Sequence, residues 1–350
     1  MKNLPARLAI VAALAALSGC SSSTPSSTSS LSADADRYAS YTQTYTIPYS
    51  VTPNFANLTS TLKVQAQVNG GTISNFTVDT GSVGVVVPAS EVPNIPSGSP
   101  SGSLTYSSSG LKLTGVWVTM PVVFPQATGS GSLSGKVATA TVPVLAVTSG
   151  TCTGSGVNSG NCTGTIPHML GVGYGRGTTT ETSPPYNAFL TLAEMTAGTM
   201  RRGYTIARDG ITLGITSVSS SGYAMAALTS AGTPASGSKN DWTTVSGGFQ
   251  VGSSAAVTGT VLLDTGLLNM IVENVNMPQS GTLSSGTKMV VTIAQQSYTF
   301  ALGDGGVQTP TSASYASASH GTYLNTGLRA LGHYDYLFDA DGGYSGLRPE

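Results

Sequence analysis

Short stretches of alternating apolar and polar residues recur from residue 41 to the C-terminus. Alternation with a period of two predicts β-strands, because successive side chains of a strand point to opposite faces of a sheet. The expected strands are Tyr41–Val51, Leu62–Val68, Leu111–Val118, Val137–Val147, Ile211–Ile215, Lys288–Ile293 and Tyr334–Phe338. Helical periodicity is limited mainly to Asn187–Met195. Many short strands, few helices and frequent glycine turns predict an all-β fold.

One of these strands ends in a group that can do chemistry. Gly70-Gly71 is expected to form a hairpin turn, and the next strand runs through Phe76 into Asp79-Thr80-Gly81-Ser82. A strand that stops at Gly81 would hold the Asp79 carboxylate at a tight turn backed by buried β structure. The pattern returns 185 residues later, where Val261-Leu262-Leu263 leads into Asp264-Thr265-Gly266-Leu267.

Two carboxylates on equivalent turns indicate a duplicated half-domain whose turns meet at a pseudo-twofold axis. Like charges a few ångströms apart do not both ionise easily, so such a pair shares one proton near neutrality. One carboxylate can then act as general base on a water while the other acts as general acid. The alternative interpretation is that Asp79 and Asp264 are two turn residues of a β-sandwich.

The doubled Asp-Thr-Gly turn resembles that of the pepsin-like aspartic peptidases. This resemblance implies an all-β, bilobal fold with pseudo-twofold related lobes, and an aspartic endopeptidase that cleaves peptides or proteins without a metal or organic cofactor. It implies that Asp79 and Asp264 are catalytic and that Thr80 and Thr265 form mutual side-chain hydrogen bonds beneath them. The other supporting residues that it implies are Gly81, Ser82 and Gly266.

Further segments extend the resemblance along the chain. Leu104–Gly110 matches the flap that closes over substrate, with Tyr106 at the position of the flap tyrosine, although Tyr106 could equally be a surface residue. Met169–Gly173 looks like the apolar-apolar-Gly segment behind the first aspartate. Gly203–Thr216 resembles the end of the first lobe, and the residues from Leu337 to Pro349 resemble the closing strands. The predicted lobes are therefore 41–215 and 216–350.

Three departures weaken the resemblance to an active peptidase. Leu267 stands where the family has Ser or Thr, so we expect Asp264 to lack a hydroxyl donor and the pKa values of the pair to rise. Val86 replaces a tryptophan that helps to pack the flap tyrosine, and Asn325-Thr326-Gly327 keeps only the glycine of the second apolar-apolar-Gly segment. The alternatives are a non-catalytic peptide- or protein-binding lipoprotein on the same fold, and a surface adhesin or structural β lipoprotein with no cleft.

The N-terminus has the pattern of a targeting signal. Basic Lys2 and Arg7 precede an apolar run that is too short to span a bilayer. Residues 1–19 are followed by Cys20, and Leu17-Ser18-Gly19-Cys20 resembles a bacterial lipoprotein cleavage box. The resemblance implies that Cys20 is lipidated and becomes the first mature residue. The alternative is an ordinary signal peptide with a chance cysteine.

The residues after Cys20 indicate how the protein would be held at a membrane. Residues 20–40 begin with a Ser/Thr/Pro-rich stretch that is typical of a flexible tether. Ser21 carries no inner-membrane retention cue of the Asp type. We therefore expect a lipid-anchored protein of the bacterial cell envelope, held at the outer membrane and facing the periplasm or the cell surface.

Composition narrows the remaining functions. Charged residues make up only 8% of the chain and the net charge is −1, so no surplus of basic residues favours binding to nucleic acid. We also expect the protein to be a monomer. Cys152 and Cys162 form an even pair in an exported chain and predict a local disulfide. The histidines show no metal-ligand spacing, and no metal site is expected. The glycine run at Gly171–Gly177 lacks the Lys-Ser/Thr ending of a phosphate-binding loop.

Overall fold

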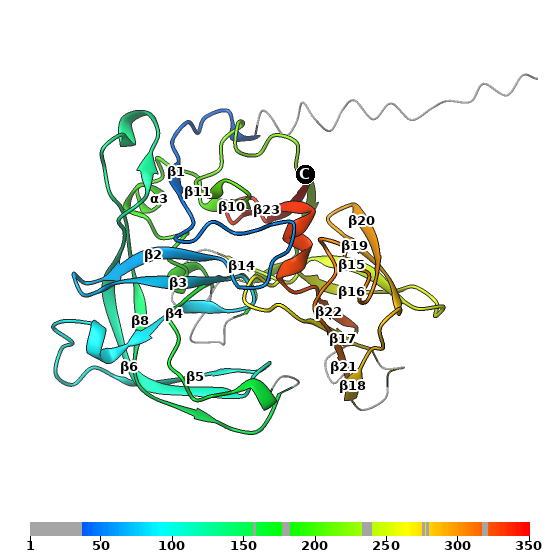
Figure 1. Cartoon of the computed structure of the whole chain (residues 1–350). Helices are drawn as coiled ribbons and strands as arrows, with labels where there is room; N and C mark the ends of the chain where they lie inside the picture. Colours follow the sequence, from blue (N-terminus) through cyan, green and yellow to red (C-terminus); the bar gives the residue numbers. More distant parts are fainter. Residues whose placement is uncertain are drawn as a thin grey trace, which may run out of the picture.

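The computed structural model describes residues 37–156, 159–176, 183–232, 240–274, 277, 280–316 and 321–350. The predicted signal peptide at 1–19, Cys20 and the tether up to residue 36 lie outside the described residues, as does His320. Within the described part, strands dominate and the helices are single turns (Figure 1). The all-β prediction is confirmed.

The first part of the chain builds a seven-stranded sheet, which lies on one side of the molecule in Figure 1. Its spatial order is β2 (Lys63–Val68), β3 (Ile73–Asp79), β9 (Met169–Val172), β4 (Val83–Pro88), β8 (Ala138–Cys152), β6 (Leu111–Phe124) and β5 (Ser101–Tyr106). Buried residues alternate with more exposed ones in β2, whereas β4 and β9, at the centre of the sheet, are buried along nearly their whole length.

The later part builds an eight-stranded sheet on the opposite side. Its order is β18 (Ser280–Thr282), β21 (Ala313–Ala316), β17 (Met270–Glu273), β22 (Tyr323–Asn325), β16 (Val257–Leu262), β15 (Ser246–Val251), β19 (Lys288–Ile293) and β20 (Gln296–Ala301). The strands β13 (Ser230–Gly232) and β14 (Asp241–Trp242) form a separate pair.

A third sheet joins the two parts. Its order is β12 (Ala224–Ala227), β24 (Tyr344–Pro349), β23 (Tyr334–Asp339), β10 (Gly203–Ala207), β11 (Gly210–Leu213), β1 (Tyr45–Ile47) and β7 (Thr128–Gly129). The central strands β10 and β23 pair antiparallel and are buried along their whole length. This sheet holds the two outer sheets in one body.

The same three-strand unit occurs in both outer sheets. In the first, β9 runs parallel to β3 and antiparallel to β4. In the second, β22 runs parallel to β16 and antiparallel to β17. Each aspartate lies at or just after the end of the outer parallel strand of its unit, β3 or β16. This repetition is the pseudo-twofold relation predicted from the doubled motif.

The predicted helix Asn187–Met195 is wrong for most of its length, because α3 covers only Ala193–Thr196. The Asn187 side chain bonds the backbone instead of allowing a helical turn: Nδ2 donates to the Val172 carbonyl, and Oδ1 accepts from the N–H of Phe189. Such side-chain bonds compete with helix formation. A second short helix, α2 (Ser183–Tyr186), was not predicted.

Several strand boundaries also differ from the prediction. The strand expected at Tyr41–Val51 is reduced to β1 and stops before Pro48, which has no N–H to donate. β6 and β8 run on to Phe124 and Cys152, because they pair with each other along most of their length. The hairpin before Asp79 turns at Asn69-Gly70 rather than Gly70-Gly71. The φ angles of these two residues are 49° and 75°, and tight two-residue hairpin turns require positive φ angles.

Candidate active site

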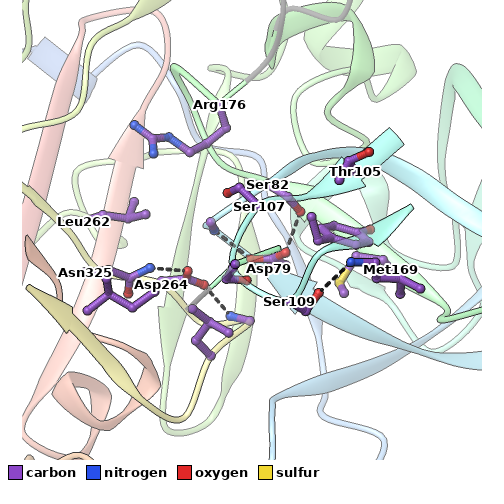
Figure 2. A pocket seen from close by; sticks show the side chains of 18 of the residues that line it. Asp79, Ser82, Thr105, Ser107, Ser109, Met169, Arg176, Leu262, Asp264 and Asn325 are labelled. Atoms are coloured by element: carbon purple, nitrogen blue, oxygen red, sulfur yellow. Dashed lines mark hydrogen bonds between the residues drawn. The ribbon is translucent and has the colours of Figure 1, made fainter. Parts of the chain in front are cut away.

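Asp79 and Asp264 lie together at the floor of a cleft of about 720 Å³ that residues of both lobes line (Figure 2). Asp79 is the last residue of β3, and Asp264 follows β16 by two residues. Their exposed fractions are 6% and 5%. The alternative of a structural protein with no cleft is therefore wrong.

The glycine after each aspartate allows the two turns to approach. A Cβ added at Gly81 would lie 2.3 Å from Oδ2 of Asp264, and one added at Gly266 would lie 2.4 Å from Oδ1 of Asp79. No side chain fits at such a distance. Each carboxylate therefore lies against the backbone of the opposite turn, and the Asp-Thr-Gly sequence is explained by this close contact.

The two threonines lock the turns to each other. Thr80 Oγ1 donates to the Leu263 carbonyl and accepts from the N–H of Thr265 at 3.0 Å. Thr265 Oγ1 donates to the Val78 carbonyl and accepts from the N–H of Thr80 at 3.0 Å. The expected mutual bonding is present, but each hydroxyl bonds the backbone of the opposite lobe rather than the other hydroxyl. Both side chains are buried, so the carboxylates above them are held rigidly.

Each carboxylate accepts two hydrogen bonds from its own lobe. Asp79 accepts from the N–H of Gly81 at 2.7 Å and from Ser82 Oγ at 2.5 Å. Asp264 accepts from the N–H of Gly266 at 2.8 Å and from Asn325 Nδ2 at 2.6 Å. With Leu267 in the turn, Asp264 accepts no hydroxyl bond, as expected, but the Asn325 amide supplies a side-chain bond in its place (Figure 2).

Burial dominates the electrostatics of the pair. Burial, followed by the charge of Asp264, raises the pKa of Asp79 to about 8, against the opposing bonds from Ser82 and Gly81. Burial also raises the pKa of Asp264, while the Asn325 amide, the Gly266 N–H, a hydrogen bond with Asp79 and the charge of Arg176 oppose the rise. The two carboxyls therefore hold a proton at pH values where an exposed aspartate is ionised.

This proton makes the stability of the protein depend on pH. The unfolded chain releases the Asp79 proton near 3.8, whereas the folded protein retains it up to about 8. The folded state binds more protons across this window, so we expect the free energy of unfolding to fall as pH rises, by up to about 1.4 kcal/mol per pH unit. Denaturant titrations at several pH values measure the slope.

Asp79→Asn is the matched variant for that measurement, and it should reduce the slope. It should not abolish the slope, because burial raises the pKa of Asp335 to about 7 and Asp335 contributes in the same direction. A slope in Asp79→Asn equal to that of the wild type would contradict the assignment of the proton to this pair.

The structure places Tyr106 on the lining of the cleft, at the end of β5. Its ring packs on an apolar cluster that contains Val86, Leu145 and the indole of Trp117. The Tyr106 hydroxyl is buried and has no hydrogen-bond partner among the described residues, and burial raises its pKa well above the usual value. Val86, in this cluster, has no donor or acceptor for the hydroxyl.

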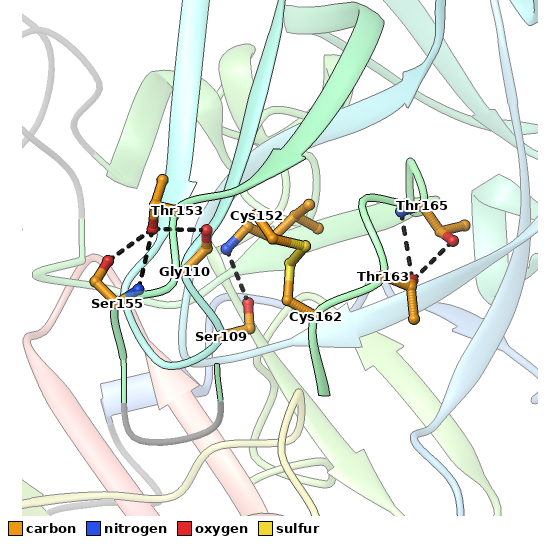
Figure 3. Close-up of a disulfide and its surroundings, with 9 residues drawn as sticks. Ser109, Gly110, Cys152, Thr153, Ser155, Cys162, Thr163 and Thr165 are labelled. Atoms are coloured by element: carbon orange, nitrogen blue, oxygen red, sulfur yellow. Dashed lines mark hydrogen bonds between the residues drawn. A yellow bond between two sulfur atoms is a disulfide. The ribbon is translucent and has the colours of Figure 1, made fainter. Parts of the chain in front are cut away.

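The predicted disulfide between Cys152 and Cys162 is present, and it lies beside the flap (Figure 3). It closes a loop that begins where β8 pairs with the start of β6. Within this loop, both the N–H and Oγ1 of Thr153 donate to the Gly110 carbonyl at 2.9 Å. The loop therefore packs against the hairpin that carries Tyr106.

Sequence reasoning missed two residues of the cleft, Asn325 and Arg176. Arg176 is the one basic side chain among the described residues that line the cleft, and it donates to the Thr244 hydroxyl. Asn325 was noted only as a departure from an apolar position. The signal that could have identified it is a buried amide in a strand next to a catalytic carboxylate, since such an amide needs a partner.

Of the described histidines, neither His168 nor His333 lines the cleft. His168 Nε2 lies 2.9 Å from Glu91 Oε2. Among the described residues, no group of three or more His, Cys, Asp or Glu side chains could hold a metal ion. No helix in this part of the chain is long and apolar enough to cross a bilayer.

Comparison with known proteins gives a structural match but no sequence match. No family model matches the chain, and a search of curated proteins found no match. Among solved structures, the aspartic proteinase from Irpex lacteus matches with a TM-score of 0.54 and 18% sequence identity. The match covers 88% of this chain and 97% of that chain. At this identity the likeness shows a shared fold.

Proposed function

We propose that this chain, which has the pepsin-like bilobal fold, is an aspartic endopeptidase. The observation that carries the proposal is the pair of buried carboxylates, Asp79 and Asp264, each lying against the glycine of the opposite turn at the floor of one cleft. Fold alone does not fix activity, so the proposal rests on this geometry.

The reaction follows from one proton shared by two carboxyls. A water bound between Asp79 and Asp264 loses a proton to the ionised carboxylate as its oxygen attacks the scissile carbonyl carbon. The protonated carboxyl donates toward the carbonyl oxygen, and a tetrahedral diol forms. One carboxyl then protonates the leaving nitrogen while the other accepts a hydroxyl proton, and the C–N bond breaks. The pair returns to its original total of one proton.

We infer that the cleft accepts an extended peptide, because apolar side chains of both lobes line it, among them Leu104, Leu262 and Ile271. A peptide laid between the lobes would be covered by Tyr106, whose ring would exclude water from the carboxylates.

A second candidate function is peptide or protein binding without cleavage, which Val86 favours as a departure from the peptidase pattern. Incubation of the purified protein with casein and with a peptide library, with and without pepstatin, separates the two. Pepstatin-sensitive cleavage supports the peptidase. Saturable peptide binding without cleavage over a broad pH range would support the binding protein.

We also propose that the protein is anchored through a lipid on Cys20 and faces the periplasm or the cell surface from the outer membrane. The support is the Leu17–Cys20 box and the tether that follows it. Cys20→Ala should leave the precursor unprocessed or release the protein into the soluble fraction, as membrane fractionation and N-terminal mass would show. Wild-type protein that is soluble and carries no lipid mass would contradict this.

A further inference from the structure

The two lobes supply a side-chain donor to their aspartates from different places. In the first lobe the donor is Ser82, three residues after Asp79 in the turn. The equivalent residue of the second turn is Leu267, which has no donor. There the donor is Asn325, which lies on a neighbouring strand, 61 residues further along the chain.

Strand register shows that this is an exchange between equivalent positions. Thr77, two residues before Asp79, pairs with Met169 on β9. Leu262, two residues before Asp264, pairs with Asn325 on β22. Met169 and Asn325 are thus equivalent, and Ser82 and Leu267 are equivalent. One lobe has a hydroxyl on the turn and an apolar side chain on the strand, while the other lobe has the reverse.

The orientation of the Asn325 amide is fixed by its second contact. Oδ1 of Asn325 accepts from the backbone N–H of Gly327 at 2.9 Å, and a backbone N–H only donates. The Nδ2 group must therefore face Oδ2 of Asp264, 2.6 Å away. Asn325 is 3% exposed, so water does not compete for this bond.

An amide NH₂ and a hydroxyl differ in the protonation states of a carboxyl group with which they can form a hydrogen bond. The Asn325 NH₂ only donates, so it bonds an ionised Oδ2 of Asp264. It has no acceptor for a proton on that oxygen. The Ser82 hydroxyl can donate to ionised Asp79 or accept from protonated Asp79. Asp79 can therefore carry the proton on the oxygen that its side-chain partner contacts, whereas a proton on Oδ2 of Asp264 would remove the bond from Asn325.

We propose that Asn325 is a positioning residue that fixes Asp264 as the ionised carboxylate and leaves the shared proton on Asp79. The inference rests on the proposed function for its catalytic meaning. Asp264 is then the general base that accepts the water proton, and Asp79 is the general acid that donates toward the carbonyl oxygen.

Of the other charged or titratable groups among the described residues that line the cleft, the one cation favours this assignment and the two tyrosines stay neutral. Arg176 lines the cleft, and its positive charge favours ionised Asp264. Tyr106 lies near Asp79, and burial raises its pKa well above the usual value, so it stays neutral. Tyr323 lines the cleft beside Asp264, and burial raises its pKa to about 12. Glu273 also lines the cleft, on β17.

The test is a ¹³C NMR titration of the aspartate carboxyls in the purified protein, with signals assigned from Asp79→Asn and Asp264→Asn. In the wild type, Asp264 should ionise at the lower pH. Asn325→Leu should raise that lower pKa by about one pH unit, because a hydrogen bond to a charged group is lost. Adding Leu267→Thr to Asn325→Leu should bring it back. Met169→Leu, at the equivalent position of the first lobe, should leave it unchanged.

Asn325→Met is the second variant if Asn325→Leu does not fold. It places beside Asp264 the residue type of the equivalent first-lobe position, Met169, and removes the donor, so it should raise the lower pKa in the same direction. If the protein cleaves peptides, the pKa of the acid limb in the pH profile of kcat/KM should shift by the same amount as the lower pKa measured by NMR.

The outcomes separate this inference from the proposed function, because the titration needs no turnover. If Asp79 ionises first in the wild type, or if neither Asn325 variant moves the lower pKa, the inference is overturned even when the protein cleaves peptides. If Asp264 ionises first and the Asn325 variants behave as expected but no peptide is cleaved, the assignment stands and the peptidase proposal fails.

Discussion

Asp79→Asn and Asp264→Asn are each expected to abolish peptide cleavage, with a loss of at least about 10³-fold in kcat/KM. An asparagine neither accepts the water proton nor donates one to the substrate, and the remaining carboxylate cannot fill both roles in one turnover. The side chains are nearly isosteric, so the Thr80 and Thr265 bonds that join the turns should be retained.

The measurement is cleavage of one peptide substrate across a range of pH, with circular dichroism to show that each variant is folded. Asp209→Asn is the matched control, since Asp209 is exposed on the turn between β10 and β11 and should leave cleavage unchanged. Cleavage near the wild-type level in either dyad variant would mean that the activity lies elsewhere in the protein or in a contaminant.

The elements that the sequence predicts best are those whose pattern is local. Alternation in Lys288–Ile293 identifies β19 to the residue, because one face of that strand is buried and the other is exposed. The false helix at Asn187–Met195 shows the limit of this reasoning. Apolar spacing there is compatible with a helix, but Asn187 bonds a carbonyl of β9 that only the folded chain brings near.

The residues of the candidate site also divide into those that a local motif reveals and those that depend on the folded chain. The doubled Asp-Thr-Gly motif reveals both carboxylates, because the contact between the turns requires glycine at the same place in each. Asn325 was missed because its role depends on the register between β16 and β22, which adjacent residues do not encode. Leu267 therefore suggested a missing donor, although the donor is supplied from another strand.

The sheet that joins the lobes ends at an ion pair whose carboxylate is fully buried. Asp339 ends β23 and is 0% exposed. Its Oδ1 accepts from Arg201 Nε at 2.9 Å, and its Oδ2 accepts from Arg201 Nη2 at 2.9 Å and from the Tyr38 hydroxyl at 3.0 Å. The Gly342 N–H donates to Oδ1 at 3.0 Å. This carboxylate therefore ties together the segment before β1, the segment before β10, and the loop after β23.

Asp339→Ala is expected to lower the free energy of unfolding by about 3–5 kcal/mol, because it leaves the mostly buried Arg201 guanidinium without its partner. Asp341→Ala is the matched control in the same loop. Its pair with Arg202 is more exposed on the carboxylate side, and exposed ion pairs contribute about 1 kcal/mol or less. Denaturant titration of both variants at one pH measures the difference. Equal losses would show that burial of the Arg201–Asp339 pair does not determine its contribution.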